Sequence, residues 1–233
     1  AFFIARSGRP GPVLVDITKN AQFEELDFEY KPCKGVRSYV PVPTPDPEAI
    51  EKAAELINQA KKPYIIYGQG VILGQAEAEL KALVEKAGIP AAWTILGLSA
   101  MDSDHPLNVG MVGMHGNYGP NVLTNECDVL IAIGMRFDDR VTGNLESYAK
   151  QAQIIHFEID PAEVNKNVPV DVAVLGDARE TLSLLLPKIR KNSHDAWLAE
   201  FHKKYEEEYS TVIEKDIHPK KPGLTMGEVV SEI

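Results

Sequence analysis

The chain has 233 residues, enough for one large α/β domain or for one domain with pieces of its neighbours at the ends. Its 44% hydrophobic and 25% charged residues are ordinary for a globular protein, and no apolar run approaches the ~18 residues of a membrane-spanning helix. A formal net charge of −10 argues against nucleic acid as a partner, since nucleic-acid-binding proteins normally carry a basic patch.

Residues 1–47 are expected to end one domain and to lead into the next. The chain starts at Ala1 without Met, and residues 1–20 predict a helix end, a Gly-Pro-rich turn and a short buried strand over Val13–Ile17. Residues 21–47 contain five prolines, which favour extended chain, so this stretch is predicted to be a linker.

Strands and helices are predicted to alternate over residues 48–190. A helix starts at Asp46, a suitable N-cap, and ends at Lys61–Pro63. Apolar runs predict strands over 63–67, 89–94, 129–133, 153–159 and 170–175, and further helices over 76–87, 119–126 and 178–189. This order predicts an α/β fold: a doubly wound, mostly parallel six-stranded sheet with helices on both faces, which is a Rossmann-like central domain.

The C-terminal part predicts a linker helix and a connection over residues 191–222. In the helix over 193–213, Trp197, Phe201, Tyr205 and Tyr209 recur every four residues, which predicts a packed face. Residues 223–233 stop inside the first turns of an amphipathic helix. Both ends therefore look cut, and we expect a fragment of a longer polypeptide.

The segment Gly134–Gly143 carries the strongest functional signal. It directly follows the predicted strand 129–133 and contains two Arg, two Asp and two Gly. Ligands of open α/β sheets bind beyond the carboxyl ends of the strands. Arg136 and Arg140 offer planar cations for phosphate or carboxylate, although the four charges could also pair among themselves.

Glycine-rich segments occur at two other places. Gly68-Gln-Gly70 follows the strand 63–67 and permits close backbone approach, as nucleotide-binding turns do, but it also fits a plain turn. Gly110–Gly116 is predicted to be a loop and not rigid core, and a flat aromatic ligand could lie on it. His115 in this loop is either a ligand contact or a surface imidazole.

Acidic residues close the last two predicted strands. Glu158, Asp160 and Asp177 could bind ribose hydroxyls or cap the following helices. Cys33 and Cys127 show no metal-ligand spacing and no disulfide framework, so a reducing cytoplasm is the expected compartment. With no nucleophile elbow and no Walker loop, the residues predict an FAD- or dinucleotide-binding domain without catalytic machinery or a metal site.

Taken together, four stretches resemble the catalytic subunits of the acetolactate synthase (acetohydroxyacid synthase) family of thiamine-diphosphate enzymes. They are Ser7–Asp16, Gly110–Gly119, Gly134–Asn144 and His156–Pro161. The resemblance implies that residues 1–20 are the tail of a pyrimidine-binding domain. It also implies that 48–190 are an FAD-binding central domain and that 223–233 begin a pyrophosphate-binding domain.

The resemblance also implies site residues. Implied FAD contacts are Arg9, Gly68, Gln69, Gly70, Thr94, Ile95, Leu96, Met114, His115, Gly116, Arg136, Val141, Glu158, Ile159, Asp177 and Ala178. Arg140, with Asp139 and Met114, matches the substrate channel, where it would attract a 2-keto-acid carboxylate. The family's activating glutamate and its Gly-Asp-Gly…Asn motif, which holds Mg²⁺ and diphosphate, are absent. No catalytic residue is therefore expected in this fragment, which should be inactive alone.

The implied reaction of the parent enzyme decarboxylates pyruvate and joins the hydroxyethyl unit to pyruvate or 2-ketobutyrate, for branched-chain amino-acid synthesis. The parent is expected to be a homodimer or homotetramer that binds thiamine diphosphate and Mg²⁺ outside this region, and it could have a regulatory subunit. Two alternatives stay open. The chain could come from a glyoxylate carboligase or pyruvate oxidase type of enzyme, or the central domain could be a ligand-free scaffold.

Overall fold

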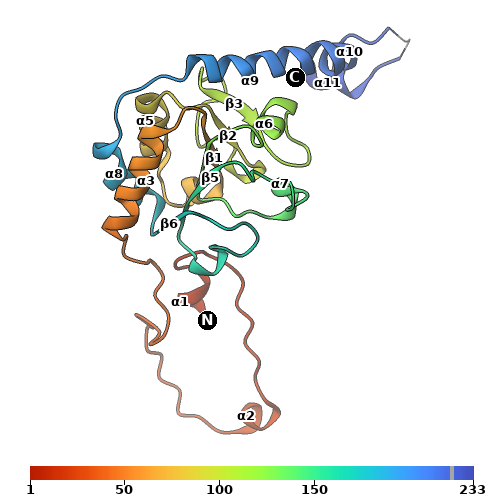
Figure 1. The fold of residues 1–233 in the computed structure, drawn as a ribbon. Coiled ribbons are helices and arrows are strands. Elements are labelled where there is room, and N and C mark those ends of the chain that lie inside the picture. Colours follow the sequence, from red (N-terminus) through yellow and green to blue (C-terminus); the bar gives the residue numbers. More distant parts are fainter. Residues whose placement is uncertain (221–222) are drawn as a thin grey trace.

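The computed structural model describes residues 1–220 and 223–233 (Figure 1). Its strands are β1 (Pro63–Tyr67), β2 (Ala91–Trp93), β3 (Asn108–Met111), β4 (Val129–Ile133), β5 (Gln153–Glu158) and β6 (Val172–Leu175). Its α-helices are α1 (Phe2–Ala5), α2 (Lys19–Phe23), α3 (Pro47–Gln59), α4 (Gln69–Leu73), α5 (Glu77–Ala87), α6 (Tyr118–Leu123), α7 (Asp139–Thr142), α8 (Ala178–Leu185), α9 (Asp195–Glu208), α10 (Glu214–Ile217) and α11 (Met226–Ser231). Residues 221–222, at the end of the predicted connection, lie outside the described residues.

The six strands form one parallel sheet in the order β3-β2-β1-β4-β5-β6. Every residue of β1 and β4 is buried, as expected for central strands that are covered on both faces. The predicted doubly wound α/β fold is therefore confirmed. The strand order reverses between β1 and β4, and such a reversal opens a crevice at the carboxyl ends of the strands.

Helices cover both faces of the sheet (Figure 1). Helices α3, α5 and α8 pack together on one face over a core that includes Ile65, Ile131 and Phe157. Helices α6 and α9 cover the other face, where Tyr64 packs against Phe201 with ring centroids 5.1 Å apart.

Helix starts follow the capping chemistry that the sequence predicts. The Asp46 carboxylate accepts a hydrogen bond from the Glu48 N–H, with Pro47 in the first turn. The Asp177 carboxylate accepts from the N–H groups of Arg179 and Glu180 at the start of α8. Both helices are thereby fixed at their N-terminal ends.

The predicted buried strand over Val13–Ile17 is wrong. No strand of the described chain pairs with this segment, and Leu14 is 92% exposed. The segment belongs to a long excursion of residues 1–45 that leaves the domain and returns at α3, which we call the N-terminal arm (Figure 1). The arm exposes further apolar side chains, such as Phe23 and Leu26.

The prediction that Gly110–Gly116 is entirely loop is also wrong, because the edge strand β3 runs into it. An edge strand pairs on one side only, here with β2, and therefore tolerates glycine better than a central strand does. Asn117 supports the turn that follows, since its side-chain oxygen accepts from the N–H of Met111 at 3.0 Å.

The aromatic face of α9 is packed only in its first half. Trp197 and Phe201 are buried, and the Trp197 indole N–H donates to the Pro63 carbonyl at 2.9 Å, whereas Tyr205 is half exposed. After Glu208 the helix continues through a π-helical turn, Tyr209–Ile213, into α10. None of the helices described is both long and apolar enough to cross a membrane.

Candidate functional site

A pocket of about 830 Å³ opens at the carboxyl edge of the sheet. Residues at or just beyond the ends of all six strands line it, and residues of the N-terminal arm complete the wall. The arm contributes Arg6, Gly8, Arg9 and Pro10. The pocket therefore lies where the strand order predicts a ligand crevice.

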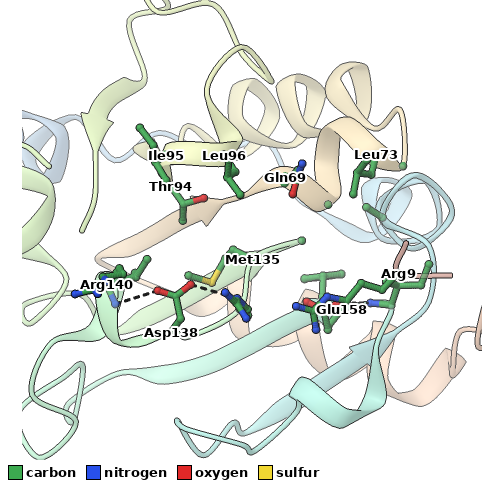
Figure 2. Close-up of a pocket in the computed structure, with 18 of the residues that line it drawn as sticks. Arg9, Gln69, Leu73, Thr94, Ile95, Leu96, Met135, Asp138, Arg140 and Glu158 are labelled. Carbon is green, nitrogen blue, oxygen red and sulfur yellow. Dashed lines mark hydrogen bonds and ion pairs between the residues drawn. The ribbon is translucent and has the colours of Figure 1, made fainter. Parts of the chain in front are cut away.

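Most of the sequence-predicted site residues meet in this pocket. Those that line it are Arg9, Gln69, Gly70, Thr94, Ile95, Leu96, Met114, His115, Arg136, Arg140, Val141, Glu158, Ile159, Asp177 and Ala178. Four candidates do not line it: Gly68, Gly116, Asp139 and Asp160. Figure 2 shows Arg140 and Arg9 at opposite ends of the pocket, with Gln69, Thr94, Ile95 and Leu96 facing them across it.

Gly68 and Gly70, in the turn after β1, allow two backbone segments to pack closely. A Cβ on Gly70 would lie 2.6 Å from the Gly134 Cα, and one on Gly68 would lie 2.6 Å from the Met135 Cβ. Both glycines let α4 lie directly against the loop after β4, with the Gly70 N–H donating to the Gly134 carbonyl at 2.8 Å. This close approach joins the loops after β1 and β4 into one rigid floor.

The charges of the Gly134–Gly143 segment pair only in part. Nε of Arg136 lies 3.3 Å from Oδ2 of Asp138, while the other Asp138 oxygen accepts from the backbone N–H of Arg140. No carboxylate of the described chain pairs with the Arg140 guanidinium, whose Nη1 lies 4.0 Å from the Met114 sulfur. Arg136 is more than half exposed, so its pairing leaves it accessible to a ligand in the pocket.

Glu158 organises the turn after β5. Its Oε1 accepts from the N–H groups of Ile159 and Asp160 at 3.0 and 3.1 Å, and its Oε2 lies 3.6 Å from Nε2 of the buried His156. The same His156 nitrogen lies 2.9 Å from the Met135 carbonyl, which links β5 to the loop after β4. Asp177 likewise caps α8, so both acids shape the backbone that borders the pocket.

Arg9 reaches from the N-terminal arm to the turn after β5. Its Nη1 lies 2.6 Å from Oε1 of Glu163 and 3.1 Å from Oδ2 of Asp160. The Lys166 ammonium lies 2.9 Å from the same Glu163 oxygen. Burial alone would raise the pKa of Glu163, but hydrogen bonds from Lys166 and Arg9 outweigh it and hold that pKa below its ordinary value.

Several further residues line the pocket that were not named individually as site residues from the sequence. They are Arg6, Gly8, Pro10, Leu73, Gly74, Met111, Val112, Gly113, Gly134, Met135, Asp138, Phe157 and Gly176. Six of them, from Met111 to Gly113 and at Gly134, Met135 and Asp138, belong to the two segments that the sequence predicted as ligand loops. Leu73, Gly74, Phe157 and Gly176 lie close to predicted strand ends. Arg6 and Pro10 have no such signal, because their place depends on how the arm folds back.

Comparison with known families decides what kind of domain this is. Residues 50–185 match the model of the thiamine pyrophosphate enzyme central domain. The chain belongs to this family. The match spans the sheet from α3 to α8 and therefore includes every strand that contributes to the pocket.

Curated relatives carry consistent names. The chain is 49% identical, over 80% of its length, to the acetolactate synthase large subunit of Corynebacterium glutamicum, of which it covers 30%. Over its whole length it is 42% identical to the probable acetolactate synthase large subunit of Methanocaldococcus jannaschii and 36% identical to the acetolactate synthase large subunit of Cyanidium caldarium. It covers 41% of each of these two, so it spans well under half the length of these relatives.

Proposed function

We propose that this chain is the central, flavin-binding region of an acetolactate synthase, and that FAD occupies the pocket at the carboxyl edge of the sheet. The single observation that carries the proposal is the pocket itself. It is long and lined with arginines, and it is built from the ends of all six strands in a domain of this family.

The residues present fit the parts of FAD. Arg9 and Arg136 can meet its diphosphate, because a guanidinium offers several N–H donors in a planar fork. Exposed apolar side chains such as Ile95, Leu96 and Met114 offer a surface for a flat ring system. FAD is a structural group in this proposal and carries no redox step.

A titration of the purified protein with FAD, followed by flavin fluorescence, tests the proposal. We expect saturable binding of one FAD per chain, weakened about tenfold (~1.4 kcal/mol) by Arg136→Ala, since one charge-assisted contact is lost. Arg190→Ala is the matched control, because Arg190 lies beyond the opposite end of α8 and lines only a second, smaller pocket. Saturable binding that Arg136→Ala and Arg190→Ala leave equally strong would place FAD elsewhere, and absence of binding would favour a ligand-free scaffold.

We further propose that the whole enzyme decarboxylates pyruvate and adds the resulting unit to a second 2-keto acid, with thiamine diphosphate and Mg²⁺ held by residues outside this chain. The names of the relatives and the family match support this assignment. Arg140, Asp139 and Met114 would border the substrate channel. An acetolactate assay with all cofactors should show no product from the 233-residue chain alone, and product from it would contradict this assignment of sites.

The same proposal covers the ends of the chain and its assembly. Residues 1–20 would belong to a pyrimidine-binding domain and 223–233 to a pyrophosphate-binding domain. The enzyme would be a homodimer or homotetramer. Sedimentation of the whole protein tests its assembly, and a monomeric active enzyme would contradict it.

A further inference from the structure

We propose that Glu163 is a positioning residue: it fastens Arg9 to the pocket wall so that the rest of the Arg9 guanidinium stays directed at an anionic group of the ligand. This inference rests on the proposed flavin function. It concerns a residue that does not itself line the pocket.

The Arg9 guanidinium uses only one of its three nitrogens in contacts with the described chain. Both carboxylates, Glu163 and Asp160, contact the same nitrogen, Nη1. Nε and Nη2 donate to no residue of the described chain, so they remain available for a phosphate. A guanidinium held at one nitrogen keeps its planar fork in a fixed orientation, which lowers the cost of ordering it when a ligand binds.

Glu163 is more deeply buried than the other anchor of Arg9. Its side chain is only 7% exposed and accepts from Arg9 and Lys166, whereas the side chain of Asp160 is 28% exposed. Asp160 also caps the short turn that follows it, through the Ala162 N–H. Glu163 is therefore the better-fixed of the two anchors.

Few other polar contacts hold this part of the arm to the rest of the chain. The Tyr39 hydroxyl donates to the Ser7 carbonyl at 2.8 Å, but Tyr39 belongs to the arm itself. Gly8 lies against the Pro41 carbonyl, again within the arm. In the described chain, the ion pairs of Arg9 are the salt bridges that join residues 1–12 to the sheet domain.

Replacing the Glu163 carboxylate by an uncharged amide of nearly the same shape distinguishes a positioning role from a simple effect of charge. Arg9 and Lys166 carry two positive charges here, against two negative charges on Glu163 and Asp160. Glu163→Gln leaves this end of the pocket one unit more positive, so charge alone predicts tighter FAD binding. Positioning predicts the opposite, a loss of about fivefold to tenfold in affinity.

The test measures FAD, ADP and riboflavin affinities of the purified protein and of the variants Glu163→Gln, Arg9→Ala and Arg9→Ala/Glu163→Gln. We expect Glu163→Gln to weaken FAD and ADP but not riboflavin, which has no phosphate, and to have no further effect once Arg9 is alanine. Glu55→Gln, an exposed glutamate on α3, is the matched control. Unchanged or tighter FAD binding by Glu163→Gln would overturn the proposal.

Two further measurements test the proposal if Glu163→Gln does not fold or if the wild-type protein binds no FAD. If Glu163→Gln does not fold, the variant Arg9→Lys takes its place. Because the lysine ammonium can still pair with Glu163, amide exchange over residues 3–11 should be as slow as in wild type. FAD should nevertheless bind about tenfold more weakly, since the planar fork of the guanidinium is lost. Fast exchange in Arg9→Lys, or FAD affinity equal to wild type, would contradict the assignment. If wild type binds no FAD, the flavin function fails, and exchange over residues 3–11 in Glu163→Gln still decides the fastening.

Discussion

The pocket has a floor and a wall, and the two are built differently. One, the floor, is made of the turns that follow the strands of a six-stranded sheet, with backbones in contact at Gly70 and Gly134. The other is part of the N-terminal arm, which exposes many apolar side chains and reaches the sheet domain through the ion pairs of Arg9. This difference indicates a preformed floor and a fastened wall, so ligand affinity and global stability should respond to different mutations.

The two cysteines give the largest expected contrast between these regions. Cys127 is fully buried, and burial raises the pKa of its thiol to about 12, whereas Cys33 in the arm is exposed. Because only the thiolate reacts, we expect Cys33 to be alkylated at pH 8 at least ~10³-fold faster than Cys127 in the native protein. Mass spectrometry of the labelled protein measures both rates. Comparable rates would mean that the sheet domain opens as readily as the arm.

Alanine at two glycines compares the regions by stability. Gly70→Ala places a Cβ 2.6 Å from the Gly134 Cα, so we expect a loss of about 2 kcal/mol in the free energy of unfolding. A Cβ added to Gly11 in the arm would have no other atom within 4 Å, so Gly11→Ala should change that free energy by less than ~0.5 kcal/mol. Urea denaturation measures both variants, and equal effects would contradict the distinction between floor and wall.

Removal of one hydroxyl should loosen the arm without touching the sheet. Tyr39→Phe deletes the hydrogen bond to the Ser7 carbonyl, worth about 1 kcal/mol. We therefore expect amide exchange over residues 3–11 to accelerate about fivefold while the urea midpoint stays unchanged. A lower midpoint would show that the arm and the sheet unfold as one unit.

The Arg9–Glu163 pair predicts the direction of one pH effect. The pKa of Glu163 is lowered in the folded protein, relative to ~4.3 in an unfolded chain. Its contribution to stability is therefore fully present above that ordinary value and is lost as the pH falls through the lowered folded pKa. Carboxyl-carbon NMR should give a Glu163 titration midpoint below ~4.3 that rises in Arg9→Ala. A midpoint at or above the unfolded-chain value in wild type would contradict the ion pairs.

Much of the fold could be predicted because its signals are local. Continuous apolar runs predicted the central strands, and Asp46 and Asp177 predicted helix starts that the structure confirms. The edge strand β3 escaped prediction because its residues Asn108–Met111 are half-buried and include a glycine, so no periodic pattern marks them. The strand predicted over Val13–Ile17 was wrong for the opposite reason. Its apolar run predicts a buried strand, but no neighbouring strand of the described chain pairs with it, and its side chains are exposed.

The parts of the candidate site that follow strand ends could be predicted from the sequence. The parts that depend on contacts between residues far apart in the sequence could not. Arg136 and Arg140 follow β4 directly, so their place at the pocket follows from topology. Glu163 and Lys166 gave no signal, because their importance comes from an arginine that lies 154 residues before Glu163 in the sequence. Gly68 and Gly70 were predicted either for close approach to a ligand or for a plain turn. The structure shows close approach of two backbone segments at both glycines, and Gly70 also lines the pocket.

The most direct test of a preformed floor and a fastened wall is amide hydrogen exchange, resolved along the chain, with and without FAD. We expect amides of β1 and β4 to exchange slowly in both states, while those of residues 3–11 exchange faster than the strands and become further protected when FAD binds. Protection by FAD that is confined to the strand-end turns, with residues 3–11 unchanged, would contradict this view of the pocket.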